Sequence, residues 1–181
     1  GITQQIGSVS VSVSPFASVY RGFIYLAPSG RFSPLPGSSM LWEYRQNDAF
    51  FAGGEFQVHH TTSWNLDADL GVEYIWNQNT DNGLPLPLSP PASVLLALEY
   101  PLPILLASQG FFKMGVNLRK TWDQNRVARN EQATPGYFLI DLRLEARRDV
   151  FKVPVEFVLS ARNLANAQYF NHLSRYRLIN I

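Results

Sequence analysis

Hydrophobic and polar residues alternate along much of the chain. Within residues 66–77 every even-numbered position is apolar, and most odd-numbered positions are polar. The same period of two returns in residues 110–122, 137–147 and 153–162. Successive side chains of a β-strand point to opposite faces, so each segment is predicted to be a strand with one apolar and one polar face.

Three further segments are less regular but are also predicted to be strands: residues 8–26, 41–60 and 93–100. Pro15 in the first and Gly53–Gly54 in the second predict local irregularities, because proline and glycine interrupt regular strand pairing. No segment has convincing helical periodicity, although residues 163–169 are compatible with one short turn of helix. The pattern therefore predicts an all-β, antiparallel fold with seven strands.

The connections between these strands alternate in length. Long connections cover residues 27–40, 78–92, 123–136 and 163 to the end, and shorter ones cover residues 61–65, 101–109 and 148–152. In an antiparallel meander, every second connection lies at the same end of the sheet. One end is therefore expected to carry long loops and the other short turns, as in a transmembrane β-barrel with extracellular loops and periplasmic turns.

The tryptophans are placed as this interpretation requires. Trp42, Trp76 and Trp122 fall where predicted strands meet long loops, and Trp64 falls at a short turn. Aromatic girdles mark both interfaces of membrane barrels. A soluble β-sandwich remains an alternative, because alternation alone does not tell whether the apolar face meets lipid or a protein core.

Composition excludes several other classes. The chain has 181 residues, 15 basic and 14 acidic side chains and no cysteine. The balanced charge argues against a nucleic-acid partner, and the lack of cysteine removes disulfides and thiolate metal sites from consideration. The uncharged stretch of residues 82–98 contains four prolines and is not expected to form a membrane-spanning helix.

Residue patterns typical of enzymes are missing as well. The sequence has neither a glycine-rich phosphate loop nor a Gly-x-Ser-x-Gly elbow. His59 and His60 are adjacent strand residues, so they are expected to point to opposite faces and not to share a metal ion. We therefore expect no catalytic residue, no metal site and no cofactor.

The polar strand faces carry many charged residues, which we expect to face the lumen of the barrel or a plug inside it. For each residue the alternative is an internal ion pair without contact to a transported ligand, because charges inside a barrel must be paired or hydrated. The set comprises Asp67, Asp69, Glu73, Lys113, Arg119, Asp141, Arg143, Glu145, Arg147, Glu156 and Arg162.

Two groups of aromatic and cationic residues lie in the long loops, where recognition residues concentrate. We expect them to contact an anionic ligand outside the cell. For the second group the alternative is that packing fixes the loop. The first group is Trp122, Arg126 and Arg129, and the second is Tyr169, His172 and Arg175 with their neighbours Tyr176 and Arg177.

Four sequence pieces resemble, in the same order, the barrel of TonB-dependent outer-membrane receptors. Each resembles a strand or loop of that family, and together they cover residues 44–175. The pieces are YRQNDA at 44–49 with GGE at 53–55, LPLPLSPP at 84–91, QNR at 124–126 with TPGY at 134–137, and NL at 163–164 with YFNHLSR at 169–175.

The resemblance implies that residues 1–181 are the C-terminal third of a barrel of about 22 strands in the outer membrane of a Gram-negative-type cell. The plug domain and the final strand are expected to lie outside this sequence. The implied partners are membrane lipid, the remaining barrel strands, and TonB with its inner-membrane motor, which would act through the plug.

The resemblance also implies active uptake of a scarce small ligand. The candidate cargoes are a metal chelate such as a siderophore, haem, cobalamin or an oligosaccharide. Two alternatives remain within the membrane class: a passive porin, and a small self-closed barrel with an eighth strand that the periodicity does not reveal.

Overall fold

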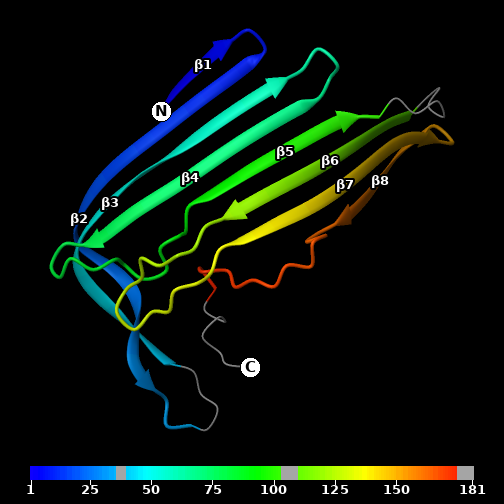
Figure 1. The fold of residues 1–181 in the computed structure, drawn as a ribbon. Helices are drawn as coiled ribbons and strands as arrows, with labels where there is room; N and C mark the ends of the chain where they lie inside the picture. The colour runs from blue at the N-terminus through cyan, green and yellow to red at the C-terminus, as the bar shows by residue number, and fades with distance from the viewer. Residues whose placement is uncertain (36–39, 103–109, 175–181) are drawn as a thin grey trace.

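The computed structural model describes residues 1–35, 40–102 and 110–174. They form one antiparallel sheet in which each strand pairs with the next one along the chain (Figure 1). The strands are β1 (Ile2–Ile6), β2 (Val9–Phe32), β3 (Met40–Thr61), β4 (Asp67–Asn79), β5 (Ser93–Pro101), β6 (Gly110–Thr121), β7 (Tyr137–Val150) and β8 (Val153–Ala161).

The predicted all-β, antiparallel fold is confirmed, but the described residues form eight strands instead of seven. The additional strand is β1, which pairs with the first residues of β2 from Ile2↔Val13 to Ile6↔Val9. Its central residues Thr3, Gln4 and Gln5 are all polar, so its sequence shows no alternation. No helix in the described ranges is long and apolar enough to span a membrane.

Two alternatives from the sequence, the soluble β-sandwich and the small self-closed barrel, are wrong for the described residues. There is one sheet, not the two packed sheets of a β-sandwich, and β1 and β8 stand at its opposite edges instead of pairing with each other. The eighth strand therefore does not close a small barrel.

Strand register places the apolar residues of neighbouring strands in continuous rows. Val58, Leu70, Leu96, Leu118 and Ile140 are successive partners across β3 to β7. All five point to one face by the alternation of strand side chains. We call this side of the sheet the apolar face.

The opposite side of the sheet is the polar wall. The row beside the apolar one contains His59, Asp69, Ala97, Asn117 and Asp141, again as successive partners. The amphipathic character that the sequence predicts is thus continuous across five strands.

Almost no protein covers the apolar face. Among the described residues, the buried apolar side chains are few, namely Ala27, Pro28, Ala49 and Leu86. Apolar-face residues such as Val72, Phe138 and Leu159 are 37%, 42% and 66% exposed. A soluble domain would bury such a face in a core, whereas a barrel in a bilayer turns it toward lipid.

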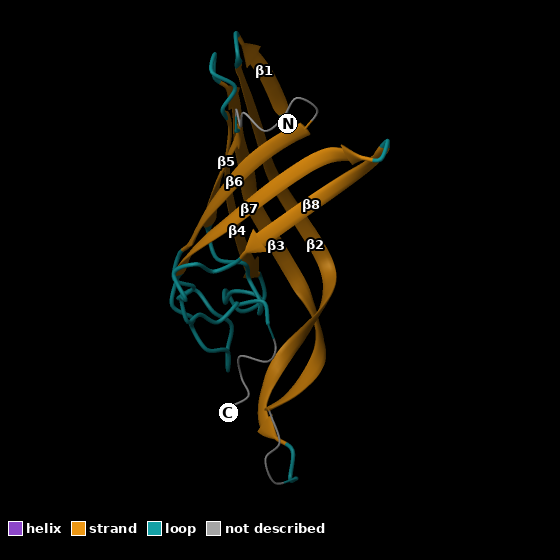
Figure 2. Ribbon diagram, turned by 90° about the vertical axis from the view of Figure 1, so that its right-hand side faces the viewer, coloured by secondary structure: helices purple, strands orange, loops and turns teal. Residues whose placement is uncertain are grey.

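The β2–β3 hairpin is much longer than the sequence suggests. The predicted loop over residues 27–40 is wrong, because β2 continues to Phe32 and β3 begins at Met40. Pairing between β3 and β4 ends at Ala49↔Asn79, so residues 40–48 extend past the other strands (Figure 2). Trp42 lies on this extension, roughly 30 Å along the strand from the partner of Trp76, and the two tryptophans do not share one girdle.

Two of the predicted short connections, β3–β4 and β7–β8, are tight turns at the opposite end of the sheet. Val150 pairs with Val153, so Phe151 and Lys152 alone form the β7–β8 turn. The β3–β4 connection is closed by hydrogen bonds between Thr62 and Leu66. The predicted connection at 101–109 falls almost entirely outside the described residues.

The long connections gather at the other end of the sheet (Figure 2). They are the β4–β5 loop (residues 80–92), the β6–β7 loop (residues 122–136) and the described segment after β8 (residues 162–174). This segment contains turns and no helix. The long-loop end predicted from connection lengths is therefore present in the structure.

Candidate functional site on the polar wall and its loops

The predicted lumen-facing residues are brought together on the polar wall. The register joins β6 to β7 through polar-wall pairs such as Asn117↔Asp141 and Lys113↔Glu145, and Arg147 lies opposite Glu156 of β8. Arg162 follows the end of β8. The strand members are Asp67, Asp69 and Glu73 in β4, Lys113 and Arg119 in β6, Asp141, Arg143, Glu145 and Arg147 in β7, and Glu156 in β8.

Several of these charges have partners within the wall. Lys113 forms an ion pair with Glu99, and Arg143 contacts Glu145 at 3.2 Å. His59 Nδ1 lies 2.7 Å from Asp69 Oδ1. Internal pairing, the alternative considered for each residue from the sequence, thus occurs for part of the set.

Glu55 is a wall residue that the sequence reasoning missed. It lies directly opposite Glu73 across the β3–β4 pair. Both carboxylates line a shallow pocket of about 260 Å³ together with Arg119. The signal was available, because Glu55 occupies the same odd-numbered face as His59. Like charges directly opposite each other destabilise a sheet unless a cation or water intervenes.

Four aromatic residues form a second feature that the sequence did not indicate, which we call the aromatic cluster: Tyr20, Phe23, Tyr25 and Phe51. Ring centroids are 5.2 to 5.4 Å apart among Tyr20, Phe23 and Phe51, and Tyr25 stacks on Phe23 at 6.3 Å. The two bulged residues between Tyr20 and Phe23 shift the register, so residues of different parity share the polar-wall side.

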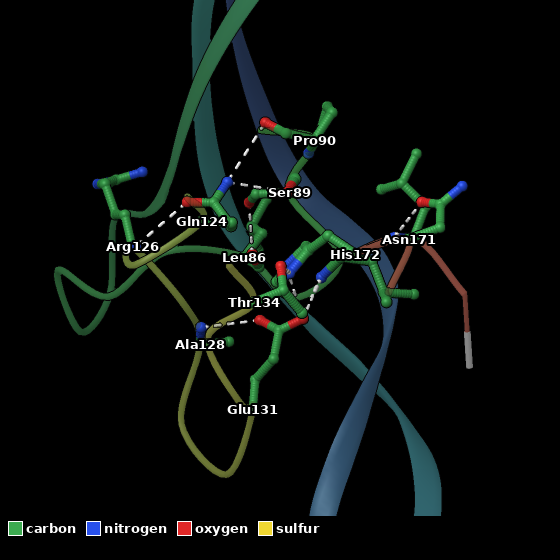
Figure 3. A network of polar contacts seen from close by, with 12 residues as sticks. Leu86, Ser89, Pro90, Gln124, Arg126, Ala128, Glu131, Thr134, Asn171 and His172 are labelled. Carbon is green, nitrogen blue, oxygen red and sulfur yellow. Dashed lines mark hydrogen bonds and ion pairs between the residues drawn. The ribbon is translucent and has the colours of Figure 1, made fainter. Parts of the chain in front are cut away.

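Glu131 joins the three long loops near the end of the polar wall (Figure 3). Its carboxylate accepts hydrogen bonds from the amide of Leu88 at 2.8 Å and the amide of Ala128 at 2.9 Å. Nε2 of His172 lies 3.4 Å from the same carboxylate, and Nδ1 of His172 lies 2.9 Å from the Thr134 hydroxyl. The Glu131 and His172 side chains are 0% and 1% exposed.

A second group of polar contacts continues this network toward β4. The Asn77 side chain bonds both the Leu86 amide at 2.9 Å and the Ser89 hydroxyl. Nε2 of Gln124 donates to the Ser89 carbonyl at 3.0 Å. Glu131, Thr134, His172, Asn77, Leu86, Ser89 and Gln124 together form what we call the loop cluster.

The loop cluster keeps Glu131 ionised. Burial by itself raises the pKa of this carboxyl, but the contact with His172 and the amide hydrogen bonds of Ala128 and Leu88 outweigh burial, and the pKa lies below its ordinary value. A buried carboxylate with these partners fixes the relative positions of three loops.

In the second predicted ligand group, Tyr169, His172 and Arg175, one member is buried by packing. His172 is buried in the loop cluster. Tyr169 is 42% exposed and packs on Tyr137, with ring centroids 4.3 Å apart. Arg175 lies outside the described residues, as do Tyr176 and Arg177. The packing alternative fits His172, while Tyr169 retains an accessible surface.

The first predicted ligand group is not brought to one point. Arg126 points away from the Glu131–His172 pair (Figure 3). Its guanidinium carbon lies 4.3 Å from the centroid of the Trp76 ring, and its Nη1 donates to the Asn77 carbonyl. Trp122 is 48% exposed, and Arg129 is exposed. Contact of these residues with a ligand stays a prediction.

A resident metal is not indicated within the described ranges, where no group of three or more His, Asp or Glu side chains is arranged to hold an ion. The side chains of the polar wall and its loops offer hydrogen bonding, ion pairing and aromatic contact. Such groups bind and position a ligand.

The single amphipathic sheet, with long loops at one end and tight turns at the other, is a fragment of an antiparallel β-barrel. The family described as "TonB dependent receptor-like, beta-barrel" matches residues 1–164. The chain belongs to this family.

Solved structures include a similar fold. One chain named "Copper transporter OprC" superposes with a TM-score of 0.72 at 23% sequence identity. The match covers 94% of this chain and 25% of that chain, so the present sequence spans about a quarter of OprC. No curated protein matches the sequence.

Proposed function

We propose that the chain is the C-terminal part of a TonB-dependent outer-membrane transporter that imports a scarce ligand. The observation that carries the proposal is family membership over residues 1–164, joined to a sheet with an uncovered apolar face and a charged wall. In this proposal the apolar face meets membrane lipid, and the polar wall surrounds a plug on which TonB acts.

The Glu55–Glu73 pair supports a plug against the wall. Two carboxylates in direct cross-strand register repel each other, and Arg119 shares their pocket. A lysine or arginine from a plug would neutralise the remaining negative charge. We propose this wall region as a plug contact.

The loops and the aromatic cluster support ligand capture from outside. The loop cluster holds three loops together over one end of the wall, and Tyr20 in the aromatic cluster is 45% exposed. Exposed aromatic rings and an exposed Arg129 suit an anionic or ring-containing ligand. The proposed cargoes are a siderophore or other metal chelate, haem, cobalamin or an oligosaccharide.

Uptake by the full-length protein tests the proposal. Cells expressing it should accumulate ligand only with TonB present and the proton-motive force intact, whereas surface binding should survive deletion of TonB. Accumulation that ignores both and follows the outside concentration would identify a passive porin and overturn the proposal.

Arg129→Ala tests the ligand contact separately from the energised step. The variant should weaken surface binding of the native ligand by about tenfold, the value of one charge-assisted hydrogen bond in a partly hydrated site. Gln132→Ala is a matched control, because Gln132 is an exposed residue of the same loop. Unchanged affinity in Arg129→Ala would remove this residue from the site.

A further inference from the structure

At their long-loop ends, β4 and β6 carry a cation and aromatic rings on the apolar face. Lys120 follows Val116 and Leu118 on this face and lies opposite Val94 and Phe138 in the register. A charged side chain on the lipid face is costly at the bilayer midplane and nearly free at the interface. Lys120 is one residue from the end of β6, which is where an interfacial residue belongs.

Arg126 adds a second cation at the same rim. It stacks on Trp76, an apolar-face residue of β4, and bonds the Asn77 carbonyl. A guanidinium has five N–H donors, so donors remain for a further partner. Within the part of the chain that the structure describes, neither Arg126 nor Lys120 has an ion pair with a carboxylate.

A pocket lies beside Arg126, at the long-loop end of β4, where β5 no longer pairs with β4. Pairing between β4 and β5 ends at Glu73↔Ser93. The pocket beyond this point measures about 240 Å³. Its lining includes Tyr74, Ala92, Asp123 and Arg126.

The one carboxylate in the pocket lining, Asp123, is hydrogen-bonded to the protein backbone. Oδ1 of Asp123 accepts a hydrogen bond of 2.6 Å from the Gly136 amide. Tyr74 is 52% exposed, and Trp122, which directly follows β6, is 48% exposed. The amide of Trp122 donates a hydrogen bond to the carbonyl of Ala92, which lines the same pocket as Tyr74.

We propose that Lys120, Arg126 and the adjoining pocket bind the phosphate-bearing headgroup of an anionic glycolipid in the outer leaflet of the membrane. We call this arrangement the rim site. Cations at headgroup depth attract anionic lipids, and arginine and lysine form charge-assisted hydrogen bonds with phosphate. Tyr74, Trp76 and Trp122 supply the aromatic surface typical of the interface.

The inference rests on the proposed outer-membrane location, since only a lipid-facing rim meets a headgroup. It differs from the ligand role predicted for Arg126 from sequence. In the rim site Arg126 binds a lipid headgroup on the membrane side of the sheet. Arg129 remains the residue proposed to contact the transported ligand at the loops.

Native mass spectrometry of the purified full-length protein, titrated with phosphorylated lipid A or with dephosphorylated lipid A, tests the rim site. The wild type should retain phosphorylated lipid A in preference to the dephosphorylated form. Lys120→Gln combined with Arg126→Gln should lower retention at least about tenfold. Lys120→Arg keeps the positive charge and should bind as the wild type does.

Arg148→Gln is the matched control, because Arg148 lies on the apolar face of β7 at the turn end of the sheet. It should leave lipid A retention unchanged. Lys120→Gln alone, at a half-buried surface position, should still lower retention if the double variant fails to form a heat-resistant barrel.

Equal retention of lipid A by the wild type and the Lys120→Gln variant would overturn the rim site. So would equal retention of phosphorylated and dephosphorylated lipid A by the wild type. Displacement of the lipid by inorganic phosphate at millimolar concentration would also overturn it. Membrane fractionation reports separately on the proposed function. A protein absent from the outer membrane would contradict the location, whereas a correctly located protein without lipid selectivity would contradict only the rim site.

Discussion

At the scale of single residues, Glu131 connects segments that are far apart in the sequence. Its carboxylate accepts hydrogen bonds from the backbone amides of Leu88 and Ala128 and contacts the His172 ring. Loss of one buried acceptor costs about 1 to 3 kcal/mol. The stability of the three long loops should therefore depend on the charge of this one side chain.

Glu131→Gln should loosen the loops, because the amide replaces one of the two acceptor oxygens by a donor group. We expect hydrogen exchange at Leu88 or Ala128 to accelerate about fivefold to 150-fold after correction for intrinsic rates, which corresponds to a loss of about 1 to 3 kcal/mol. Gln132→Ala should leave the exchange unchanged. Equal protection in Glu131→Gln and the wild type would contradict the role of the carboxylate.

The same group gives the loops a defined pH dependence. Because the pKa of Glu131 is lowered in the folded protein, its contribution to stability is fully present above the ordinary glutamate value of about 4.3. The contribution is lost as the pH falls from there through the lower folded pKa. Glu131→Gln should lack this component of the acid response.

The sequence predicted some residues of this site by type but not their contacts. His172 was expected to contact a ligand because it lies among aromatic and cationic residues of a long loop, yet the structure places it against Glu131, 41 positions earlier. No motif contains Glu131, and no spacing rule pairs loops separated by whole strands. Alternation along one strand predicted the polar wall much better, since strand geometry alone determines which face a residue such as Arg143 occupies.

At the scale of elements, the regular strands were predicted closely, the irregular β2 and β3 were predicted over residues 8–26 and 41–60, and β1 was not predicted. The segments predicted at 66–77, 137–147 and 153–162 correspond closely to β4, β7 and β8. The β2–β3 register shifts at two places, between Tyr20 and Phe23 and between Pro28 and Phe32. The irregularities predicted at Pro15 and Gly53–Gly54 are wrong, because pairing is regular there. Strand β1 is largely polar. Backbone pairing forms these strands without the side-chain period that makes a strand visible in sequence.

Strand β7 provides the test of which face meets lipid. Leu142 pairs with Val116 and Ala161 on the apolar face. Leu142→Arg should cost about 2 to 4 kcal/mol of unfolding free energy in lipid vesicles if it lies near the bilayer midplane. The neighbouring Arg143→Leu should cost less, because Arg143 lies on the polar wall and is 49% exposed. An equal or larger loss for Arg143→Leu would reverse the assignment of the faces.

The β7–β8 turn stores backbone strain that a substitution should remove. Phe151 and Lys152 have φ angles of 53° and 66°, which side chains other than Asn and Gly adopt at a cost. Phe151→Asn with Lys152→Gly should stabilise the full-length barrel by about 1 to 2 kcal/mol. Equilibrium urea unfolding in vesicles measures the gain. A loss of stability would mean that the 97% exposed Phe151 has a contact elsewhere in the full protein.

At the scale of the whole molecule, the sheet is one section of a larger barrel wall. Strands β1 and β8 are both edges, and an exposed edge presents unpaired backbone groups that pair readily with another strand. We propose that the remaining barrel strands of the full-length protein continue from these edges. The asymmetry between turn end and loop end then fixes how the wall is oriented across the membrane.

Site-directed labelling on intact cells tests this orientation most directly. Gln132 is exposed in the β6–β7 loop, and Ser63 is exposed in the β3–β4 turn. The chain itself has no cysteine, so Gln132→Cys and Ser63→Cys in the full-length protein are distinct single targets within it. A maleimide too large to cross the outer membrane should label Gln132→Cys on intact cells and Ser63→Cys only after permeabilisation. Labelling of both on intact cells, or the reverse pattern, would contradict a barrel wall with its long loops outside.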